Sequence, residues 1–240
     1  MKVIILAGGL GSRISEETAD KPKPMVLING QPILWHLMNI FSLQGYNEFI
    51  VSTGYKSEVI ENWIENNRIF DSNSKLMKIQ AINTGIKTHT GGRISEVMKS
   101  IPSESVIVTY GDGLANISTE KLLSFHQSHG KLATVTAVRP QARFGYMKIE
   151  NKRVTHFGEK KQADVGWING GFFVLEPEVR KYVNSIEEPF ESGALVRLVN
   201  DYQLMSYEHE GFWQPMDTLR EKVELEKLAL LKTPPWLKFE

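Results

Sequence analysis

Short apolar runs alternate along the first half of the chain with segments whose apolar residues recur at helical spacing. Residues 3–7, 48–52 and 105–110 are compact runs rich in apolar and β-branched residues, which is typical of buried parallel strands. Residues 33–43 and 57–64 carry apolar side chains three and four positions apart, and this spacing predicts amphipathic helices. The alternation predicts an α/β fold with an open, mostly parallel sheet and helices on both faces.

Alternating patterns become more frequent in the second half. Residues 146–157 alternate around a polar break at Asn151-Lys152, which predicts a hairpin. Antiparallel strands should therefore join the Rossmann-like sheet there. We expect one domain over residues 1–240, with a nucleotide lobe at about 1–115 and a sugar-phosphate lobe at about 116–240. The other predicted elements are strands at 77–82, 132–138, 168–175 and 204–208, and helices at 96–100, 119–129 and 217–231.

Composition excludes several classes of partner. The 28 acidic and 28 basic residues balance, which argues against nucleic acid as the main partner. No apolar run approaches the length of a membrane span, and the first run is too brief for a signal peptide. The chain has no cysteine, so disulfides and cysteine metal sites are excluded. We expect a cytoplasmic protein that binds neither nucleic acid nor membrane.

The first strand is followed by a glycine-rich loop, Leu6-Ala7-Gly8-Gly9-Leu10-Gly11-Ser12-Arg13. Three glycines in four positions let backbone N–H groups approach a phosphate or a base. A dinucleotide fingerprint needs a further glycine where Ile14 stands, and this argues against an NAD-dependent oxidoreductase. The Gly-Lys-Ser/Thr of a Walker loop is also absent from this segment.

Cationic residues follow this loop closely. Arg13 lies just past the glycines, and Lys21-Pro22-Lys23-Pro24-Met25 comes next. We expect the two prolines to hold the lysines in an extended stretch. Cations held near a glycine loop suit a triphosphate and would stabilise charge on a leaving pyrophosphate. The alternative interpretation is a tight turn followed by a solvated basic loop.

These motifs resemble the signature of sugar-1-phosphate nucleotidyltransferases, and the similarity runs nearly end to end. Within that family the chain is most similar to cytidylyltransferases that act on glucose 1-phosphate. The segments that carry the resemblance are the glycine loop, Lys-Pro-Lys-Pro-Met, Ser15-Glu16-Glu17-Thr18, Ile33-Leu34-Trp35-His36, Thr90-Gly91-Gly92-Arg93, Thr109-Tyr110-Gly111-Asp112-Gly113, Arg143-Phe144-Gly145, Asn169-Gly170-Gly171-Phe172-Phe173 and Gly211-Phe212-Trp213-Gln214-Pro215-Met216-Asp217-Thr218.

Two aspartates are candidates for holding Mg²⁺, which commonly binds one or two carboxylates plus phosphate oxygens. Asp112 follows a predicted strand and lies between two glycines. Asp217 is distant in sequence, and only the resemblance pairs it with Asp112 as a metal ligand. Without the resemblance, a helix N-cap is an alternative interpretation of Asp217, and it is compatible with a metal role. The resemblance also implies catalytic roles for Arg13, Lys23 and Asp112.

The resemblance implies two groups of binding residues. Arg93 also has a simpler interpretation, as a solvated side chain near a helix start. In a different segment, Lys161 replaces the proline that follows the family's Glu-Lys pair. The implied nucleotide-binding residues are Leu6, Ala7, Gly8, Gly9, Gly11, Ser12, Arg13, Lys23, Thr88, Arg93 and Gly111, and the implied sugar-phosphate-binding residues are Glu159, Lys160, Asn169 and Gly170.

The implied reaction joins a sugar 1-phosphate to CTP, releases pyrophosphate and forms CDP-glucose. Another sugar phosphate or a small phosphorylated acceptor, or UTP or dTTP in place of CTP, fits the glycine loop equally well. A binding protein that has lost catalysis is a further alternative, which the presence of Lys23, Asp112 and Asp217 disfavours.

The resemblance implies a homo-oligomer and a role in lipopolysaccharide or capsule biosynthesis, although the segment between Ile64 and Thr84 is shorter than in related cytidylyltransferases. His126 and His129 are expected at the surface.

Overall fold

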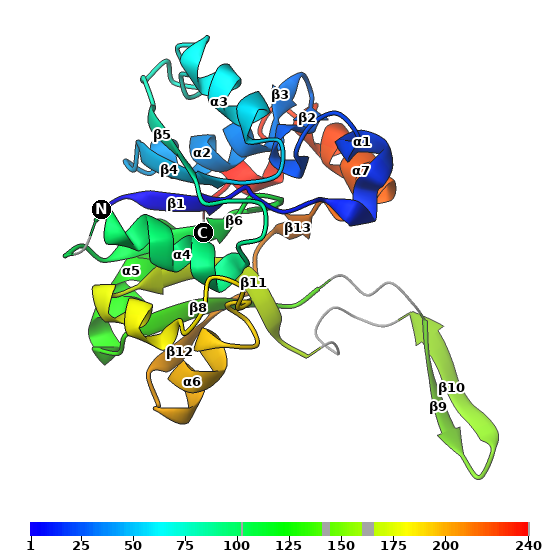
Figure 1. Ribbon diagram of the computed structural model, residues 1–240. Coiled ribbons are helices and arrows are strands. Elements are labelled where there is room, and N and C mark those ends of the chain that lie inside the picture. The colour runs from blue at the N-terminus through cyan, green and yellow to red at the C-terminus, as the bar shows by residue number, and fades with distance from the viewer. Residues whose placement is uncertain (102, 141–144, 160–165, 240) are drawn as a thin grey trace.

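The computed structural model describes residues 1–101, 103–140, 145–159 and 166–239 (Figure 1). Its centre is a seven-stranded sheet in the order β12-β8-β11-β6-β1-β4-β5. β11 runs antiparallel to both of its neighbours, and every other adjacent pair is parallel. The predicted α/β fold with a mostly parallel sheet is therefore confirmed. The strands are β1 (Val3–Leu6), β4 (Glu48–Thr53), β5 (Lys78–Asn83), β6 (Val106–Tyr110), β8 (Ala133–Val138), β11 (Ile168–Leu175) and β12 (Leu204–His209).

Helices cover both faces of this sheet (Figure 1). Along β1, Val3 and Ile5 pack into one apolar cluster with α2, α5 and α7, whereas Ile4 and Leu6 pack into a second cluster with α4 and α6. Because both faces of β1 are covered, its apolar run is continuous rather than alternating. The helices are α1 (Ser15–Thr18), α2 (Ile33–Leu43), α3 (Ser57–Glu65), α4 (Thr90–Lys99), α5 (Thr119–His129), α6 (Ala194–Asn200) and α7 (Leu219–Ala229), with 3-10 turns at Ser12–Ile14, Lys23–Met25, Pro177–Tyr182 and Pro235–Leu237.

Three two-stranded sheets accompany the seven-stranded sheet in the described part of the chain. They are β2 (Leu27–Ile28) with β3 (Gln31–Pro32), β7 (Gly113–Ala115) with β13 (Trp213–Pro215), and β9 (Gly145–Glu150) with β10 (Arg153–Glu159). The predicted β9–β10 hairpin is confirmed, and Asn151 and Lys152 at its turn both have positive φ, as a two-residue hairpin turn of this kind requires. No described helix is long and apolar enough to cross a membrane.

The order of the strands creates a crevice between β1 and β6. The chain leaves β1 toward β4 and β5, then returns to the other side of β1 as β6. In open α/β sheets, ligands bind at such a switch point, outside the carboxyl ends of the strands. The Gly111 N–H donates to the Leu6 carbonyl at 3.0 Å, which ties the two strand ends together at this point.

α4 begins six residues before the predicted helix at 96–100. Gly91 and Gly92 disfavour helix in isolation, but they let α4 pack closely against the chain preceding α6. A Cβ on Gly92 would lie 2.3 Å from the Ile186 carbonyl oxygen, and one on Gly91 would lie 2.7 Å from that of Glu188. Tertiary packing therefore decides the helix start, and it places Arg93 in the first turn.

The prediction that His126 and His129 lie at the surface is wrong for His126, whereas His129 is partly exposed. His126 is buried, and both rings hydrogen-bond to the Thr134 hydroxyl at 2.8 Å. The Lys131 N–H donates to His129 Nδ1, so the other ring nitrogen of His129, Nε2–H, donates to the Thr134 hydroxyl. His126 Nε2 lies 2.9 Å from Glu176 Oε1. Because its Nδ1 accepts a backbone N–H, His129 is neutral in this network.

We expect this network to make stability depend on pH. Burial, and then the neighbouring His126 and Lys131, lower the pKa of His129 below its ordinary value. The unfolded chain, with an ordinary pKa of about 6.5, therefore binds more protons than the folded protein just below that pH. The free energy of unfolding should fall as the pH drops through this window, and His129→Gln should reduce the fall. Tm measured from pH 8 to pH 5.5 in both proteins tests this, and identical pH slopes would contradict it.

Candidate active site

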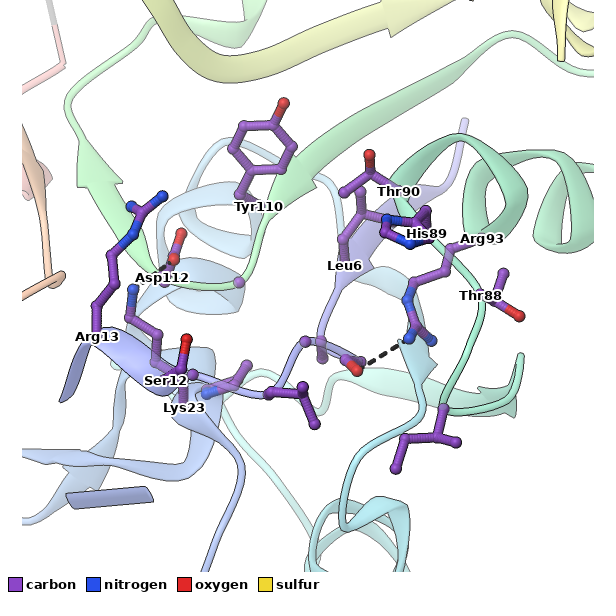
Figure 2. Close-up of a pocket in the computed structure, with 18 of the residues that line it drawn as sticks. Leu6, Ser12, Arg13, Lys23, Thr88, His89, Thr90, Arg93, Tyr110 and Asp112 are labelled. Carbon is purple, nitrogen blue, oxygen red and sulfur yellow. Dashed lines mark hydrogen bonds and ion pairs between the residues drawn. The ribbon is translucent and has the colours of Figure 1, made fainter. Parts of the chain in front are cut away.

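A cleft of about 570 Å³ lies at the switch point. Its lining includes every residue predicted to bind nucleotide or metal: Leu6, Ala7, Gly8, Gly9, Gly11, Ser12, Arg13, Lys23, Thr88, Arg93, Gly111, Asp112 and Asp217. Figure 2 shows Arg13, Lys23 and Asp112 gathered at one end, with Thr88 and Arg93 at the other. The three catalytic candidates therefore lie together at one end of the cleft.

Lys23 joins the two predicted metal ligands. Its Nζ donates to Asp112 Oδ2 at 2.7 Å and to Asp217 Oδ1 at 2.6 Å. Arg13 contacts the other oxygen of Asp217 at 2.9 Å. Pro22 is extended as predicted, but Lys23–Met25 forms a 3-10 turn rather than the extended stretch expected from the prolines. This turn directs Lys23 inward, and its side chain is only 9% exposed.

Charge pairing keeps this cluster ionised. Burial opposes the charged form of Lys23, but Asp112 and Asp217 outweigh it and raise the pKa of the ammonium above its ordinary value. Partial burial likewise opposes the carboxylate of Asp217, but Lys23 and Arg13 outweigh it and lower the pKa of Asp217. The pairing therefore favours the cationic form of Lys23 and the carboxylate form of Asp217.

The two aspartates fit a magnesium site. Asp112 and Asp217 each place an oxygen within 2.7 Å of the Lys23 ammonium, so the two carboxylates lie close enough together to share a cation. Hard carboxylate oxygens are the ligands that Mg²⁺ prefers, and it takes its remaining ligands from phosphates and water. The described residues include no group of three or more metal-binding side chains. A pair supplemented by substrate phosphate is the arrangement that they can supply.

Asp217 is not the N-cap of α7. That role belongs to Thr218, whose hydroxyl accepts from the Glu221 N–H, while the Glu221 carboxylate accepts from the N–H groups of Asp217 and Thr218. The capping box holds the backbone of Asp217 and leaves its side chain free to contact Lys23 and Arg13. The helix start thus positions the aspartate without using its carboxylate.

Arg93 is buried beneath the glycine loop rather than solvated. Its guanidinium donates to the carbonyls of Gly8 at 2.9 Å and Thr53 at 2.8 Å, and to the Thr84 hydroxyl at 2.6 Å. Burial lowers the pKa of Arg93 from its ordinary value. Because three donors are committed to the protein, Arg93 supports the wall of the cleft by fixing the Gly8 peptide.

A smaller cavity of about 240 Å³ adjoins the cleft and shares Arg13, Tyr110, Asp112 and Asp217 with it. Asn169 and Gly170, both predicted to bind the sugar phosphate, line this cavity, as does Trp213, whose Nε1–H donates to the Gly170 carbonyl at 2.8 Å. Of the other two candidates, Glu159 ends β10 but its side chain is not described, and Lys160 lies outside the described residues.

Several lining residues were absent from the predicted site, and two of them, Tyr110 and Glu191, carry polar groups into it. Tyr110 lines both cavities, and its position directly before Gly111-Asp112 could have indicated this. Glu191 lines the larger cavity from the loop before α6. It stands in an ordinary polar segment with no motif around it, so no local pattern identifies it.

Comparison with known proteins yields a consistent set of relatives. Residues 2–219 match the family model described as nucleotidyl transferase. The chain is 42% identical to glucose-1-phosphate cytidylyltransferase of Salmonella typhi over 100% of both proteins. It is 41% identical to the probable glucose-1-phosphate cytidylyltransferase of Bacillus subtilis, over 95% of this chain and 96% of that protein.

Solved structures agree on the fold. The crystal structure of HddC from Yersinia pseudotuberculosis superposes with a TM-score of 0.72 at 25% identity, and the match covers 94% of this chain and 98% of that one. A UDP-glucose pyrophosphorylase complexed with UDP-glucose superposes with a TM-score of 0.71 at 16% identity, over 95% and 97% of the two chains. The second likeness concerns the fold alone.

Proposed function

Because this chain belongs to the nucleotidyl transferase family, we propose that it joins glucose 1-phosphate to CTP, forming CDP-glucose and releasing pyrophosphate. The observation that carries the proposal is the convergence of Lys23, Asp112 and Asp217 beside the glycine loop. The two cytidylyltransferase relatives, which match nearly the full length, support the choice of nucleotide and sugar.

The residues of the cleft suit an in-line displacement. An oxygen of the sugar phosphate attacks the α-phosphorus of CTP, and the bond from that phosphorus to the bridging oxygen breaks, so pyrophosphate leaves with the bonding electrons. A phosphate oxygen is already ionised at neutral pH, so the protein need not supply a nucleophile or a strong base. Lys23 and Arg13 would orient the phosphates and stabilise the charge that develops on the leaving group. The raised pKa of Lys23 keeps it cationic for this role.

Magnesium dependence and a homo-oligomer are parts of this proposal. Asp112 and Asp217 would hold Mg²⁺, which when bound would neutralise phosphate charge. The β9–β10 hairpin exposes Met147, Ile149 and Val154, which contact with another copy would bury. Light scattering of the purified protein gives its molecular mass in solution, and a mass equal to one chain would contradict the homo-oligomer.

A pyrophosphate-release assay tests the proposed reaction. It would cross CTP, UTP, dTTP and ATP with a panel of sugar 1-phosphates, with Mg²⁺ or with excess chelator. We expect turnover with CTP and glucose 1-phosphate, and its loss when the chelator is present. No turnover with any pair would show that the proposed enzyme activity is wrong. Turnover with dTTP but not CTP would overturn the choice of nucleotide while leaving the reaction class intact.

A further inference from the structure

The Glu191 carboxylate accepts hydrogen bonds from hydroxyl groups on two different elements that line the cleft. One carboxylate oxygen accepts from the Thr90 hydroxyl at 2.8 Å, and the other accepts from the Tyr110 hydroxyl. Thr90 stands at the start of α4 and Tyr110 at the end of β6. The loop before α6 thus places one carboxylate between two elements of the nucleotide-binding half.

The direction of each hydrogen bond follows from the donors available. The Gly171 N–H donates to Asn169 Oδ1 at 2.8 Å, so the Asn169 amide nitrogen donates to the Tyr110 hydroxyl at 3.0 Å. The Tyr110 hydroxyl hydrogen must then point to Glu191. Thr90 accepts from the Phe190 N–H at 2.8 Å, so its hydrogen also points to Glu191. Glu191 is therefore an acceptor on both oxygens, as an ionised carboxylate.

This carboxylate retains acceptor capacity. An ionised carboxylate offers about four lone-pair positions, and the two hydroxyls fill two of them. Glu191 is exposed and lines the cleft. Within the described part of the chain it forms no ion pair with Lys, Arg or His. Because an anion at this position repels phosphate, its open positions suit neutral hydrogen-bond donors.

The position of Glu191 favours the sugar over the phosphates. Tyr110, its partner, lines both cavities and forms part of the boundary between them. Asn169, at the far end of the same chain of hydrogen bonds, lines the smaller cavity with Gly170 and Trp213. A ring with adjacent hydroxyls near this boundary could donate to Glu191 while its phosphate faced Lys23 and Arg13.

We propose that Glu191 binds hydroxyl groups of the sugar ring of the sugar 1-phosphate, with Thr90 and Tyr110 holding its carboxylate in place. This rests on the proposed function, and it adds a specificity-determining residue to that site. Dinucleotide-binding folds use the same chemistry for a different sugar, since an acidic side chain there accepts a hydrogen bond from a ribose hydroxyl of the nucleotide.

Steady-state kinetics of Glu191→Gln and Glu191→Ala test the assignment. We expect KM for glucose 1-phosphate to rise about 10-fold or more, since the lost hydrogen bonds are made to a charged group, while KM for CTP changes less than about 2-fold. Deoxy analogues of glucose 1-phosphate sharpen the test. Removing the hydroxyl that contacts Glu191 should weaken the substrate for the wild type and have no further effect in Glu191→Ala. Glu187→Gln, in the same loop but outside the cleft lining, should match the wild type.

Other outcomes would overturn the proposal in distinct ways. A raised KM for CTP alone would assign the carboxylate to the nucleotide. Unchanged KM values would exclude Glu191 from substrate binding. If Tyr110→Phe reproduced both the KM change and the analogue profile, Glu191 would act only by positioning Tyr110. Turnover by the wild type is measured first, so failure of the proposed reaction is detected separately. If another sugar 1-phosphate is the substrate, the same comparison is made with its deoxy analogues.

Discussion

Replacing Asp112 with Asn is expected to lower kcat/KM by about 10³-fold, the upper range for removing one group that stabilises developing charge. Asp112 contributes one of the two carboxylates that converge on the Lys23 ammonium, at 2.7 Å. The amide retains the shape and one acceptor oxygen, but it removes the negative charge that a divalent cation requires. The fold should be retained because Asp217 still pairs with Lys23, but Tm should fall because the buried ammonium loses one of its two partners. Pyrophosphate release and thermal unfolding of the same preparations measure both quantities.

The matched control is Asp20→Asn. Asp20 also lies near a lysine, Lys21 at 4.0 Å, but its side chain is 81% exposed and does not line the cleft. This variant should retain the activity of the wild type. Titration with Mg²⁺ gives a second measurement, because Asp112→Asn should need more Mg²⁺ to reach half of its own maximal rate. Full activity in Asp112→Asn would exclude Asp112 from both the catalytic and the metal-binding roles.

Local sequence signals were sufficient to predict the main strands of the sheet and the position of the glycine-rich loop at its switch point. The strands at β1, β4 and β6 follow from compact apolar runs, and the Lys-Pro-Lys-Pro-Met segment indicated a phosphate site without structural information. The pairing of Asp112 with Asp217 was different. They lie 105 residues apart (217 − 112) and are brought together by Lys23, which itself stands far from both in sequence. No spacing rule predicts that contact, so it had to come from the resemblance.

Two failures show which information a local pattern lacks. His126 and His129 lie on a helix whose pattern permits exposure, but β8 and the residue after β11 bring Thr134 and Glu176 against them. Glu191 lies in a polar loop, and its importance arises only because α4 and β6 direct hydroxyls toward it. In both cases the chemistry depends on partners contributed by distant elements.

Arg93 lines the cleft for a reason that no local pattern supplies. The place near the nucleotide that the resemblance implied for it stays a prediction. The simpler interpretation expected a solvated side chain, whereas β4 and the segment after β5 supply Thr53 and Thr84 as acceptors inside the protein. Its third acceptor, the Gly8 carbonyl, belongs to the glycine loop. The buried arginine therefore requires the absence of a side chain at Gly8.

Because Gly8 packs directly against Arg93, we expect the substitution Gly8→Ala to reduce the stability of the protein strongly. A Cβ added at Gly8 would lie 2.0 Å from one guanidinium nitrogen of Arg93 and 2.2 Å from its central carbon. Such contacts force the guanidinium away, and its three hydrogen bonds inside the protein would be broken or strained. Overpacking and the unpaired buried charge together should lower the free energy of unfolding of Gly8→Ala by about 3 kcal/mol. Chemical denaturation without substrate measures this loss.

Gly9→Ala separates the packing of Gly8 from a general intolerance of the loop. A Cβ on Gly9 meets no atom within 4 Å, so this neighbouring substitution should leave the free energy of unfolding within about 0.5 kcal/mol of the wild type. Arg93→Ala should lose stability by itself, and adding Gly8→Ala to it should cost little more, because the clashing guanidinium is gone. Equal destabilisation by Gly8→Ala with and without Arg93 would place the constraint in the loop backbone instead. The double-mutant cycle thus decides whether the glycine is needed for the arginine beneath it.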